Sequence, residues 1–351
     1  MVRFIPLGRT AFVHALGMLI GLAVMTTSGC SPNLPTSPHA VVKRSQMLMG
    51  TLVFVTAVAP DMQVADQAAK AALAEIRRLE ELLSTWIPTS ELSRVNAAAG
   101  REPVTVSPET LMVLKSSLEI GRLTNGGFNI AIGPAVEAWG VAGKGRIPDE
   151  SELTRLRPLM DLAHIRLDEG AGTVLLTQAG MRVDVGGIGK GFAADLAVAV
   201  MQAAGATAGV VALSGDIKTF GRLPNGTRFS FGIRHPRQED ALLARVELEN
   251  EAISTAGDYE KVFERDGIRY HHILDPRTLQ PARECQSVTV IAKKGVVADG
   301  LDTGIFVMGP ERGMELAERL PDVEAVIVDR DGNIGVSSGL KGRIKIIERS
   351  P

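Results

Sequence analysis

The spacing of apolar side chains limits most strongly which fold this sequence can adopt. Between residues 64 and 83, apolar residues recur every three or four positions with charged residues between them, which predicts an amphipathic helix. A second helix is expected after Pro108, because Ser107 can cap its first turn. Between residues 165 and 185 the pattern changes to short apolar segments separated by glycine-containing turns, which is typical of a strand meander. This mixture predicts an α+β fold in a single large mixed domain rather than a regularly alternating α/β fold.

The same patterns give the other expected elements. Asp329–Gly332 has the composition of a hairpin turn between strands at 325–328 and 334–336. A further helix is expected at 192–204, and strands are expected at 165–168, 174–177, 182–185, 209–213, 229–234 and 287–293.

Composition and charge exclude two classes of protein. Of the 351 residues, 45% are hydrophobic and 22% are charged, which is typical of a globular protein and excludes a disordered chain. The 40 acidic and 38 basic residues give a net charge of −2, so the chain lacks the basic surplus usual in nucleic-acid-binding proteins. Nucleic acid is therefore not an expected partner.

The N-terminus has the features of a secretion signal. Two arginines precede an apolar run from Ala11 to Met25. This run is too short for a typical membrane-spanning helix, and glycines interrupt it. Thr27-Ser28-Gly29 before Cys30 resembles the lipobox of bacterial lipoproteins, although Thr27 stands where leucine is usual. We therefore expect a lipoprotein signal peptide at 1–29, a lipidated Cys30 with a flexible linker at 30–45, and the folded domain at 46–351. The protein would be lipid-anchored at the periplasmic face of a bacterial membrane, with the inner membrane favoured.

The densest glycine cluster runs from Val183 to Gly191 and connects an expected strand to an expected helix. Backbone N–H groups at such a helix start can bind an anion. The cluster is not a phosphate-binding Walker loop, because Asp184 and Gly191 replace required residues, and it does not fit the dinucleotide pattern G-x-G-x-x-G. A purely structural tight turn remains an equal alternative.

A second cluster contains Asp299, Asp302 and Thr303. If these residues lie on a helix, they share one face and offer oxygen ligands suited to magnesium or calcium rather than zinc. The alternative is that Asp299 caps the helix and Asp302 faces water.

Two adjacent histidines form the third group of interest. His271 and His272 would face opposite sides of a strand, so they cannot form one metal pair, but either could act as a base or be structural. Cys285 is the one cysteine apart from Cys30, so no intramolecular disulfide is expected in the mature chain. Cys285 is expected to be an incidental residue rather than a nucleophile.

Six segments in a fixed order carry a resemblance that covers nearly everything after the linker. They are Met49-Gly50-Thr51; Ser84-Thr85-Trp86 with Ser90-Glu91-Leu92 and Asn96; Gly126-Gly127-Phe128-Asn129 with Gly133-Pro134; Asp184–Gly191; His272–Pro276; and Asp299–Thr303. Through them the chain resembles the ApbE family of FAD:protein FMN transferases, which implies a T-fold-like ApbE domain.

The resemblance also implies roles for particular residues. FAD would be contacted by Met49, Trp86, Gly127, Phe128, Asn129, Asp184, Lys190 and Ile273, and Mg²⁺ would be held by Gly187 through its carbonyl and by Asp299, Asp302 and Thr303. The chain departs from the usual pattern at Trp86 (commonly tyrosine), Asn129 (commonly aspartate), Ser214 (which begins what is usually Gly-Gly-Asp) and Leu279 (commonly glycine).

The expected reaction is Mg²⁺-dependent transfer of FMN from FAD to a threonine or serine hydroxyl of an acceptor protein, with release of AMP. His272 is the candidate base, and Asp184 is a second candidate catalytic residue. The family's acceptor motif, Asp-x-x-Ser/Thr-Gly-Ala-Ser/Thr, does not occur in this chain, so the acceptor is expected to be another protein, one associated with the membrane and with redox chemistry. An FAD pyrophosphatase and a non-catalytic FAD-binding lipoprotein are the alternatives.

Overall fold

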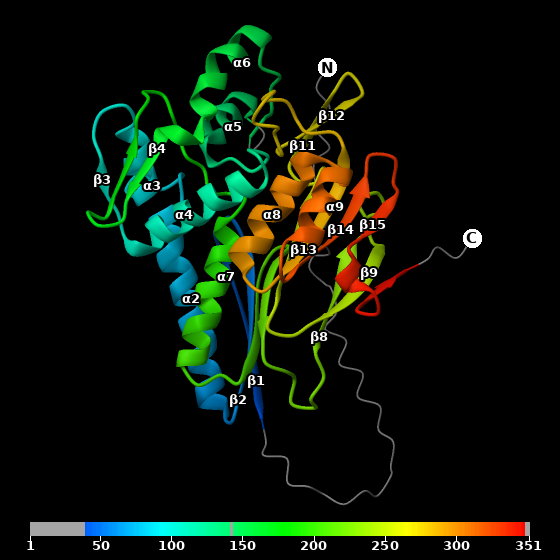
Figure 1. Ribbon diagram of the computed structural model, residues 1–351. Helices are drawn as coiled ribbons and strands as arrows, with labels where there is room; N and C mark the ends of the chain where they lie inside the picture. The colour runs from blue at the N-terminus through cyan, green and yellow to red at the C-terminus, as the bar shows by residue number, and fades with distance from the viewer. Residues whose placement is uncertain (1–38, 141–142, 348–351) are drawn as a thin grey trace, which may run out of the picture.

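An eight-stranded antiparallel sheet forms the centre of the computed structural model, which describes residues 39–140 and 143–347 (Figure 1). Successive side chains on the inner strands point to opposite faces, and both faces are buried along the central strand β13. In spatial order the strands are β1 (Ala40–Leu48), β2 (Thr51–Ala59), β6 (Ala208–Leu213), β7 (Asp216–Phe220), β10 (Ala252–Gly257), β13 (Cys285–Ala292), β14 (Val323–Asp329) and β15 (Ile334–Val336).

Four helices cover one face of this sheet: α2 (Met62–Leu83), α7 (Gly189–Ala203), α8 (Gly295–Met308) and α9 (Pro310–Arg319). Figure 1 shows α7 between α2 and α8. The apolar stripe of α2 packs into the core that these helices share with the sheet, as its spacing predicts. The Asp61 side chain caps α2 by accepting the Val64 N–H at 2.9 Å.

A three-stranded sheet packs on the opposite face of the main sheet. Its buried side chains meet Ile253 of β10, Ile291 of β13, and Val326 and Val328 of β14, while the neighbouring residues of these strands face the helices. The strands of this small sheet are β16 (Ile344–Ile346), β9 (Leu242–Leu248) and β8 (Phe229–Arg234).

The remaining elements lie beyond the ends of α2 and α8 (Figure 1). Trp139 is fully buried there, packs near Phe263 and Tyr270, and donates its indole N–H to the Leu279 carbonyl at 2.7 Å. The elements are the helices α3 (Glu91–Ala97), α4 (Pro108–Leu123), α5 (Gly133–Trp139) and α6 (Glu150–Leu156); the sheet of β3 (Val104–Thr105), β5 (Thr173–Leu176) and β4 (Ile165–Asp168); and the hairpin of β11 (Val262–Arg265) and β12 (Ile268–His271). Short 3-10 helices occupy Ile130–Ile132, Arg157–Met160, Leu162–His164 and Ser338–Leu340.

The structure confirms the α+β class and most of the expected elements. The helix at 64–83 is α2, and the helix after Pro108 is α4, where the Ser107 hydroxyl accepts the Thr110 N–H at 3.3 Å. The strand expected at 229–234 is β8, and the hairpin turn at Asp329–Gly332 joins β14 to β15.

Three expectations need correction. Residues 182–185 form no strand, because the Asn96 side chain binds both the N–H and the carbonyl of Val183 in place of a neighbouring strand. The expected meander is split, since β4 and β5 pair with β3 in a sheet of their own. The first strand, β1, begins at Ala40, so the folded chain begins before Gln46.

The expected signal peptide, Cys30 and the first part of the linker lie outside the described residues. Within the described residues, we find no helix that is both long enough and apolar enough to cross a membrane.

Candidate active site

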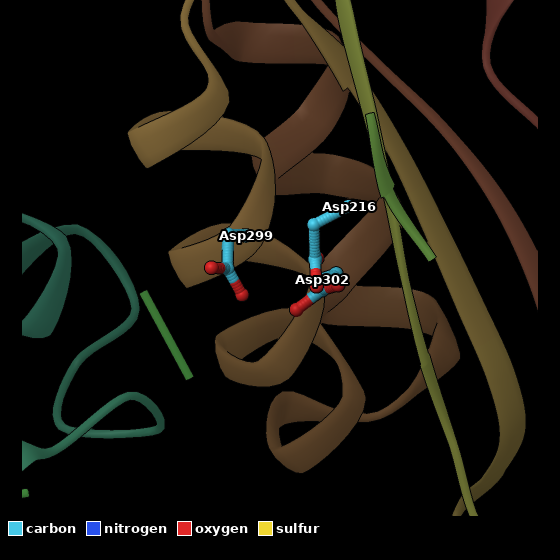
Figure 2. A group of neighbouring side chains, drawn as sticks. All are labelled: Asp216, Asp299 and Asp302. Atoms are coloured by element: carbon cyan, nitrogen blue, oxygen red, sulfur yellow. The ribbon is translucent and has the colours of Figure 1, made fainter. Parts of the chain in front are cut away.

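Three aspartates from two elements form a buried acidic cluster. Asp299 and Asp302 lie on α8, and Asp216 is the first residue of β7 (Figure 2). One carboxylate oxygen of each lies within 4.8 Å of those of the other two, and the three residues are 2–4% exposed. The helix spacing expected from the sequence therefore does place Asp299 and Asp302 together, and the sheet adds a third carboxylate.

Hydrogen bonds fix the orientation of these carboxylates. Asp299 accepts the backbone N–H of Gly191 at 2.8 Å. The buried Ser254 hydroxyl, on β10, lies 2.6 Å from Asp302 Oδ2 and also contacts Asp216. The Thr303 hydroxyl donates to the other oxygen of Asp302 at 3.1 Å.

The cluster carries more negative charge than its surroundings compensate. Burial, and then the charge of Asp216, raise the pKa of Asp299 to about 8. Burial, and then the charge of Asp299, raise the pKa of Asp302 well above its usual value. Lys190 forms an ion pair with Asp216, and although burial opposes its charge, the carboxylates raise its pKa. One ammonium facing three carboxylates leaves a site that favours a further cation.

Close packing of α7 against α8 creates this arrangement. A Cβ at Gly191 would collide with the carbonyl oxygen of Gly295, so glycine is required at the crossing. Asp195 of α7 accepts the N–H groups of Gly295 and Val296 at 2.7 and 3.0 Å and thereby caps α8. Asp299 is therefore not the cap of α8, as the structural alternative assumed, but projects from inside the helix.

The glycine-rich segment forms the loop that enters α7. The Asp184 carboxylate accepts the Gly186 N–H at 2.7 Å, and the Asp184 N–H donates to the Ile130 carbonyl at 2.8 Å. A Cβ at Gly187 would lie 3.3 Å from the Thr303 hydroxyl. The first N–H groups of α7 are already bonded: the Gly189 N–H donates to the Val185 carbonyl at 2.8 Å, and the Gly191 N–H donates to Asp299. All four expected metal-binding residues, Gly187, Asp299, Asp302 and Thr303, thus belong to one region.

Three of the expected FAD-binding residues surround this loop. The Met49 methyl group lies 3.9 Å from where a Cβ on Gly189 would be. The Phe128 ring edge lies 3.4 Å from the corresponding position at Gly187, and Gly127 packs against the Gly304 carbonyl. Met49 has a φ of 50° and donates its N–H to Glu80 near the C-terminal end of α2 at 2.6 Å.

Trp86 and Asn129 have contrasting surroundings. Trp86 follows the C-terminal end of α2 and is 81% exposed, which leaves its ring available to stack on a ligand. Asn129 uses its amide N–H to bind the Met160 carbonyl at 2.7 Å and its amide oxygen to accept the Ala131 N–H at 2.8 Å. The amide group of Asn129 therefore holds the chain locally, and its contact with FAD stays a prediction.

His272 follows directly after β12 and precedes the buried Ile273. Its Nδ1 lies 3.1 Å from the Glu260 carbonyl, and because a carbonyl only accepts, Nδ1 carries the hydrogen and Nε2 keeps its lone pair. Burial, and then the charge of Lys261, lower the pKa of His272 to about 3, and the charge of Lys190 also contributes. The ring is therefore neutral near pH 7 and lies within range of the charge of the lysine at the acidic cluster.

His271 and Cys285 have structural surroundings. His271 is buried, contacts the Ala282 carbonyl through Nε2 at 2.7 Å, and lies edge-on to Phe306. Burial raises the pKa of the Cys285 thiol to about 12, which makes it a poor nucleophile, as expected.

Asp216 and Ser254 are the two residues of the cluster that the sequence analysis did not assign to the site. A signal for Asp216 was present, because it ends the Ser214-Gly215-Asp216 segment that stands in place of Gly-Gly-Asp. Ser254 has no local motif, and it reaches the site because β10 pairs with β7.

Comparisons with known proteins agree with this geometry. The model of the ApbE family matches residues 49–327. The FAD:protein FMN transferase of Treponema pallidum is 33% identical over 87% of this chain and 89% of its own length, and that of Vibrio cholerae is 36% identical over 69% of this chain and 74% of its own.

Solved structures show the same similarity. The ApbE protein of Thermotoga maritima superposes with a TM-score of 0.80 at 29% identity, covering 87% of this chain and 99% of that one. The flavin transferase ApbE of Vibrio cholerae gives a TM-score of 0.77 at 30% identity over 87% of this chain and all of the other. The chain described here therefore belongs to the ApbE family.

Proposed function

We propose that this protein transfers the FMN part of FAD to a threonine or serine hydroxyl of an acceptor protein and releases AMP. The buried acidic cluster beside the glycine loop is the observation that carries the proposal. It offers the cation site that a diphosphate substrate requires, and the loop beside it carries the Gly187 N–H, for which no hydrogen bond is found in the described part of the chain. The relatives named above as FAD:protein FMN transferases support FMN transfer to a protein as the reaction.

The acidic cluster fits a magnesium ion. Its donors are all oxygens, and because burial and then the neighbouring carboxylates raise the pKa values of Asp299 and Asp302, a cation bound there would favour their ionised forms. Asp299, Asp302 and Thr303, with the Gly187 carbonyl, would hold the ion, and Asp216 would add charge at one side. A bound magnesium ion would supply Lewis-acid stabilisation of the phosphoryl oxygens.

The glycine loop and Lys190 would bind and orient the diphosphate. Among residues 39–140 and 143–347, no partner is found for the Gly187 N–H, which is the donor that the loop can offer to a phosphoryl oxygen. The ion pair with Asp216 holds the Lys190 ammonium at the side of the cluster, where it can face a phosphoryl oxygen. Asp184 keeps the loop in shape by binding Gly186, so its contribution is to position the donors.

His272 is suited to take the proton of the acceptor hydroxyl. The hydroxyl oxygen attacks the phosphorus on the FMN side, a new phosphoester bond forms, the diphosphate bond breaks, and AMP leaves with the bonding electron pair. Nε2 of His272 accepts the hydroxyl proton, because Nδ1 already donates to Glu260. The low pKa makes His272 a weak base, so the proton transfer would accompany bond formation rather than precede it.

We further propose that Cys30 carries a lipid that holds the domain at the periplasmic face of a membrane, with the inner membrane favoured. The small residues before Cys30 and the preceding apolar run support this location. An acceptor at the same membrane, associated with redox chemistry, would be the natural substrate.

Replacing Asp302 tests the metal site and the reaction together. Asp302→Asn should abolish transfer to an acceptor peptide, because it removes one of the charges that hold the metal. In the wild type, magnesium at a hundredfold excess over Kd should stabilise the fold by about 2.7 kcal/mol, and this gain should be lost in the variant. Transfer and thermal unfolding with and without magnesium are the measurements.

The exposed Asp240→Asn serves as the matched control and should behave like the wild type. A folded Asp302→Asn protein that magnesium still stabilises, and that still transfers FMN, would contradict the assignment. AMP release that does not depend on any acceptor would favour the pyrophosphatase.

Replacing Trp86 tests the aromatic contact. Trp86→Ala should weaken FAD binding by about 1–3 kcal/mol, whereas Trp86→Tyr should be nearly neutral. Because Trp86 is 81% exposed, the melting temperature should not change. The control is Met62→Ala, an exposed apolar residue at the start of α2. If Trp86→Ala lowers the melting temperature but leaves FAD affinity intact, the residue is structural.

Replacing His272 tests the base. His272→Ala should slow transfer by about 100-fold or more while FAD binding is retained. Since the pKa of His272 is lowered to about 3, the residue is already neutral above that pH, and the wild-type rate should show no limb near pH 6.5 that depends on it. Steady-state rates between pH 5 and 9 check this; a limb that disappears in His272→Ala would contradict it.

Replacing Cys30 tests the location. Cys30→Ser should move the protein from the membrane to the soluble fraction or stop its processing, because several acyl chains are needed for firm anchoring. Fractionation and the size of the mature chain are the measurements. Unchanged fractionation and processing would rule out the lipid anchor.

A further inference from the structure

A groove of about 700 Å³ runs between the free edge of β1 and one stripe of α2. β1 is the end strand of the main sheet and pairs with β2 alone in that sheet. The residues of α2 that line the groove recur every three or four positions, so they lie on one face of the helix. The groove therefore runs along the length of both β1 and α2. Its lining is Lys43, Arg44, Ser45 and Gln46 of β1 and Lys70, Leu73, Ala74, Arg77, Arg78 and Glu81 of α2.

The backbone along this edge is free to pair. A two-residue turn at Met49 and Gly50, both with positive φ, makes Leu48 and Thr51 the closing pair of the β1–β2 hairpin. Because the backbone groups of an antiparallel strand alternate in direction, Lys43 and Ser45 direct their N–H and carbonyl groups away from β2. Within residues 39–140 and 143–347, no hydrogen bond to these groups is found outside the β1–β2 ladder.

The groove is basic, and part of its charge is uncompensated. Five of its lining residues are basic and one is acidic. Arg44 and Lys70 share Asp66, and Arg78 pairs with Glu75 and Glu109. For Lys43 and Arg77, by contrast, no acidic side chain of the described chain lies within ion-pair distance, and both are exposed. Two positive charges are thus available to a ligand along β1, Arg77 on the helix side and Lys43 on the opposite face of the strand.

We propose that this groove binds an extended, acidic segment of the acceptor protein as an additional strand along β1. That the partner is the acceptor rests on the proposed function. Extended peptides often bind to proteins by adding a strand to an exposed sheet edge. The backbone hydrogen bonds then supply affinity, and the flanking side chains supply selectivity. Here Lys43 and Arg77 would select acidic residues.

The position of β1 links the groove to the candidate active site. The strand ends at Leu48, and the next residue is Met49, which lies beside the glycine loop. A segment paired with β1 would therefore lead its neighbouring residues toward the site where the hydroxyl must attack. Docking there would raise the local concentration of the acceptor hydroxyl.

Two other occupants fit this edge less well. A second copy of the chain would bring its own Lys43 and Arg44 to the same edge, and like charges would repel. The chain's own segment before Ala40 contains no aspartate or glutamate, and Pro32, Pro35 and Pro38 lack the N–H groups that strand pairing uses.

Charge-swapped peptides test the selectivity. Two fluorescein-labelled peptides would share a Ser-Gly-Ala-Thr core, flanked on both sides by either Val-Glu-Glu-Val or Val-Lys-Lys-Val, so that charged residues face both sides of an added strand. Fluorescence anisotropy at low salt, with the full folded domain and no FAD, measures binding separately from transfer. We expect the wild type to bind the acidic peptide about tenfold more tightly, and Lys43→Glu/Arg77→Glu to reverse the preference. The control, Arg166→Glu/Lys341→Glu, changes two exposed basic residues outside the groove and should keep the wild-type preference.

A backbone variant tests strand addition. Ser45→Pro removes an N–H that points to the free edge while leaving the hydrogen bonds to β2, so it should weaken binding of the acidic peptide about fivefold. Ser45→Ala keeps the N–H and should bind like the wild type. Unchanged melting temperatures show that both variants fold.

Each result decides the question. Equal binding of the two peptides, or an unchanged preference in Lys43→Glu/Arg77→Glu, would overturn the proposal. Binding of phosphatidylglycerol vesicles that is lost in the charge variant but kept in Ser45→Pro, without a peptide preference, would also overturn it and assign the groove to the membrane. If FMN is transferred but the acidic peptide is not preferred, the docking proposal is wrong and the proposed function stands. If the acidic peptide is preferred but no FMN is transferred, the docking proposal stands and the proposed function is wrong.

Discussion

The contact between α7 and α8 at Gly191 and Gly295 is the constraint on which the site depends. Without side chains at the crossing, the two helices approach until backbone meets backbone. That approach places the Gly191 N–H on the Asp299 carboxylate and brings the loop before α7 next to Thr303. A larger residue at either position would separate the glycine loop from the acidic cluster, so the geometry of the candidate site follows from helix packing.

The acidic cluster is an unfavourable arrangement for the folded chain by itself. Burying carboxylates beside one another costs free energy, which is what the raised pKa values of Asp299 and Asp302 express. The surrounding hydrogen bonds from Ser254, Thr303 and Gly191 reduce this cost without supplying positive charge. The carboxylates are thus held in place by hydrogen bonds, and if they bind the proposed cation, the stability of the domain should depend on its presence.

Local patterns in the sequence predict the parts of the structure that local interactions determine. The stripe of α2, the cap at Ser107 and the turn after β14 follow from residues close together in the chain. Asp299, Asp302 and Thr303 were also predictable, because their spacing on one helix fixes their shared face.

What could not be predicted depends on pairing between distant segments. Ser254 reaches Asp302 because β10 lies between β7 and β13 in the sheet, and no local pattern states that order. Residues 182–185 have an apolar pattern suited to a strand, but the Asn96 amide takes the hydrogen bonds that a neighbouring strand would make. The glycine loop is visible in the sequence itself, whereas Asp216 ends a segment that differs from the family pattern, and only the structure places it in the cluster.

The chain contains two tryptophans, and their surroundings differ sharply. Trp139 is fully buried, with its indole N–H bound to the Leu279 carbonyl, whereas Trp86 is 81% exposed. The fluorescence of Trp139 therefore reports the integrity of the fold, and that of Trp86 reports events at the surface where a flavin is proposed to stack and would quench it. The protein thus has two intrinsic optical signals that separate unfolding from ligand binding in one emission spectrum.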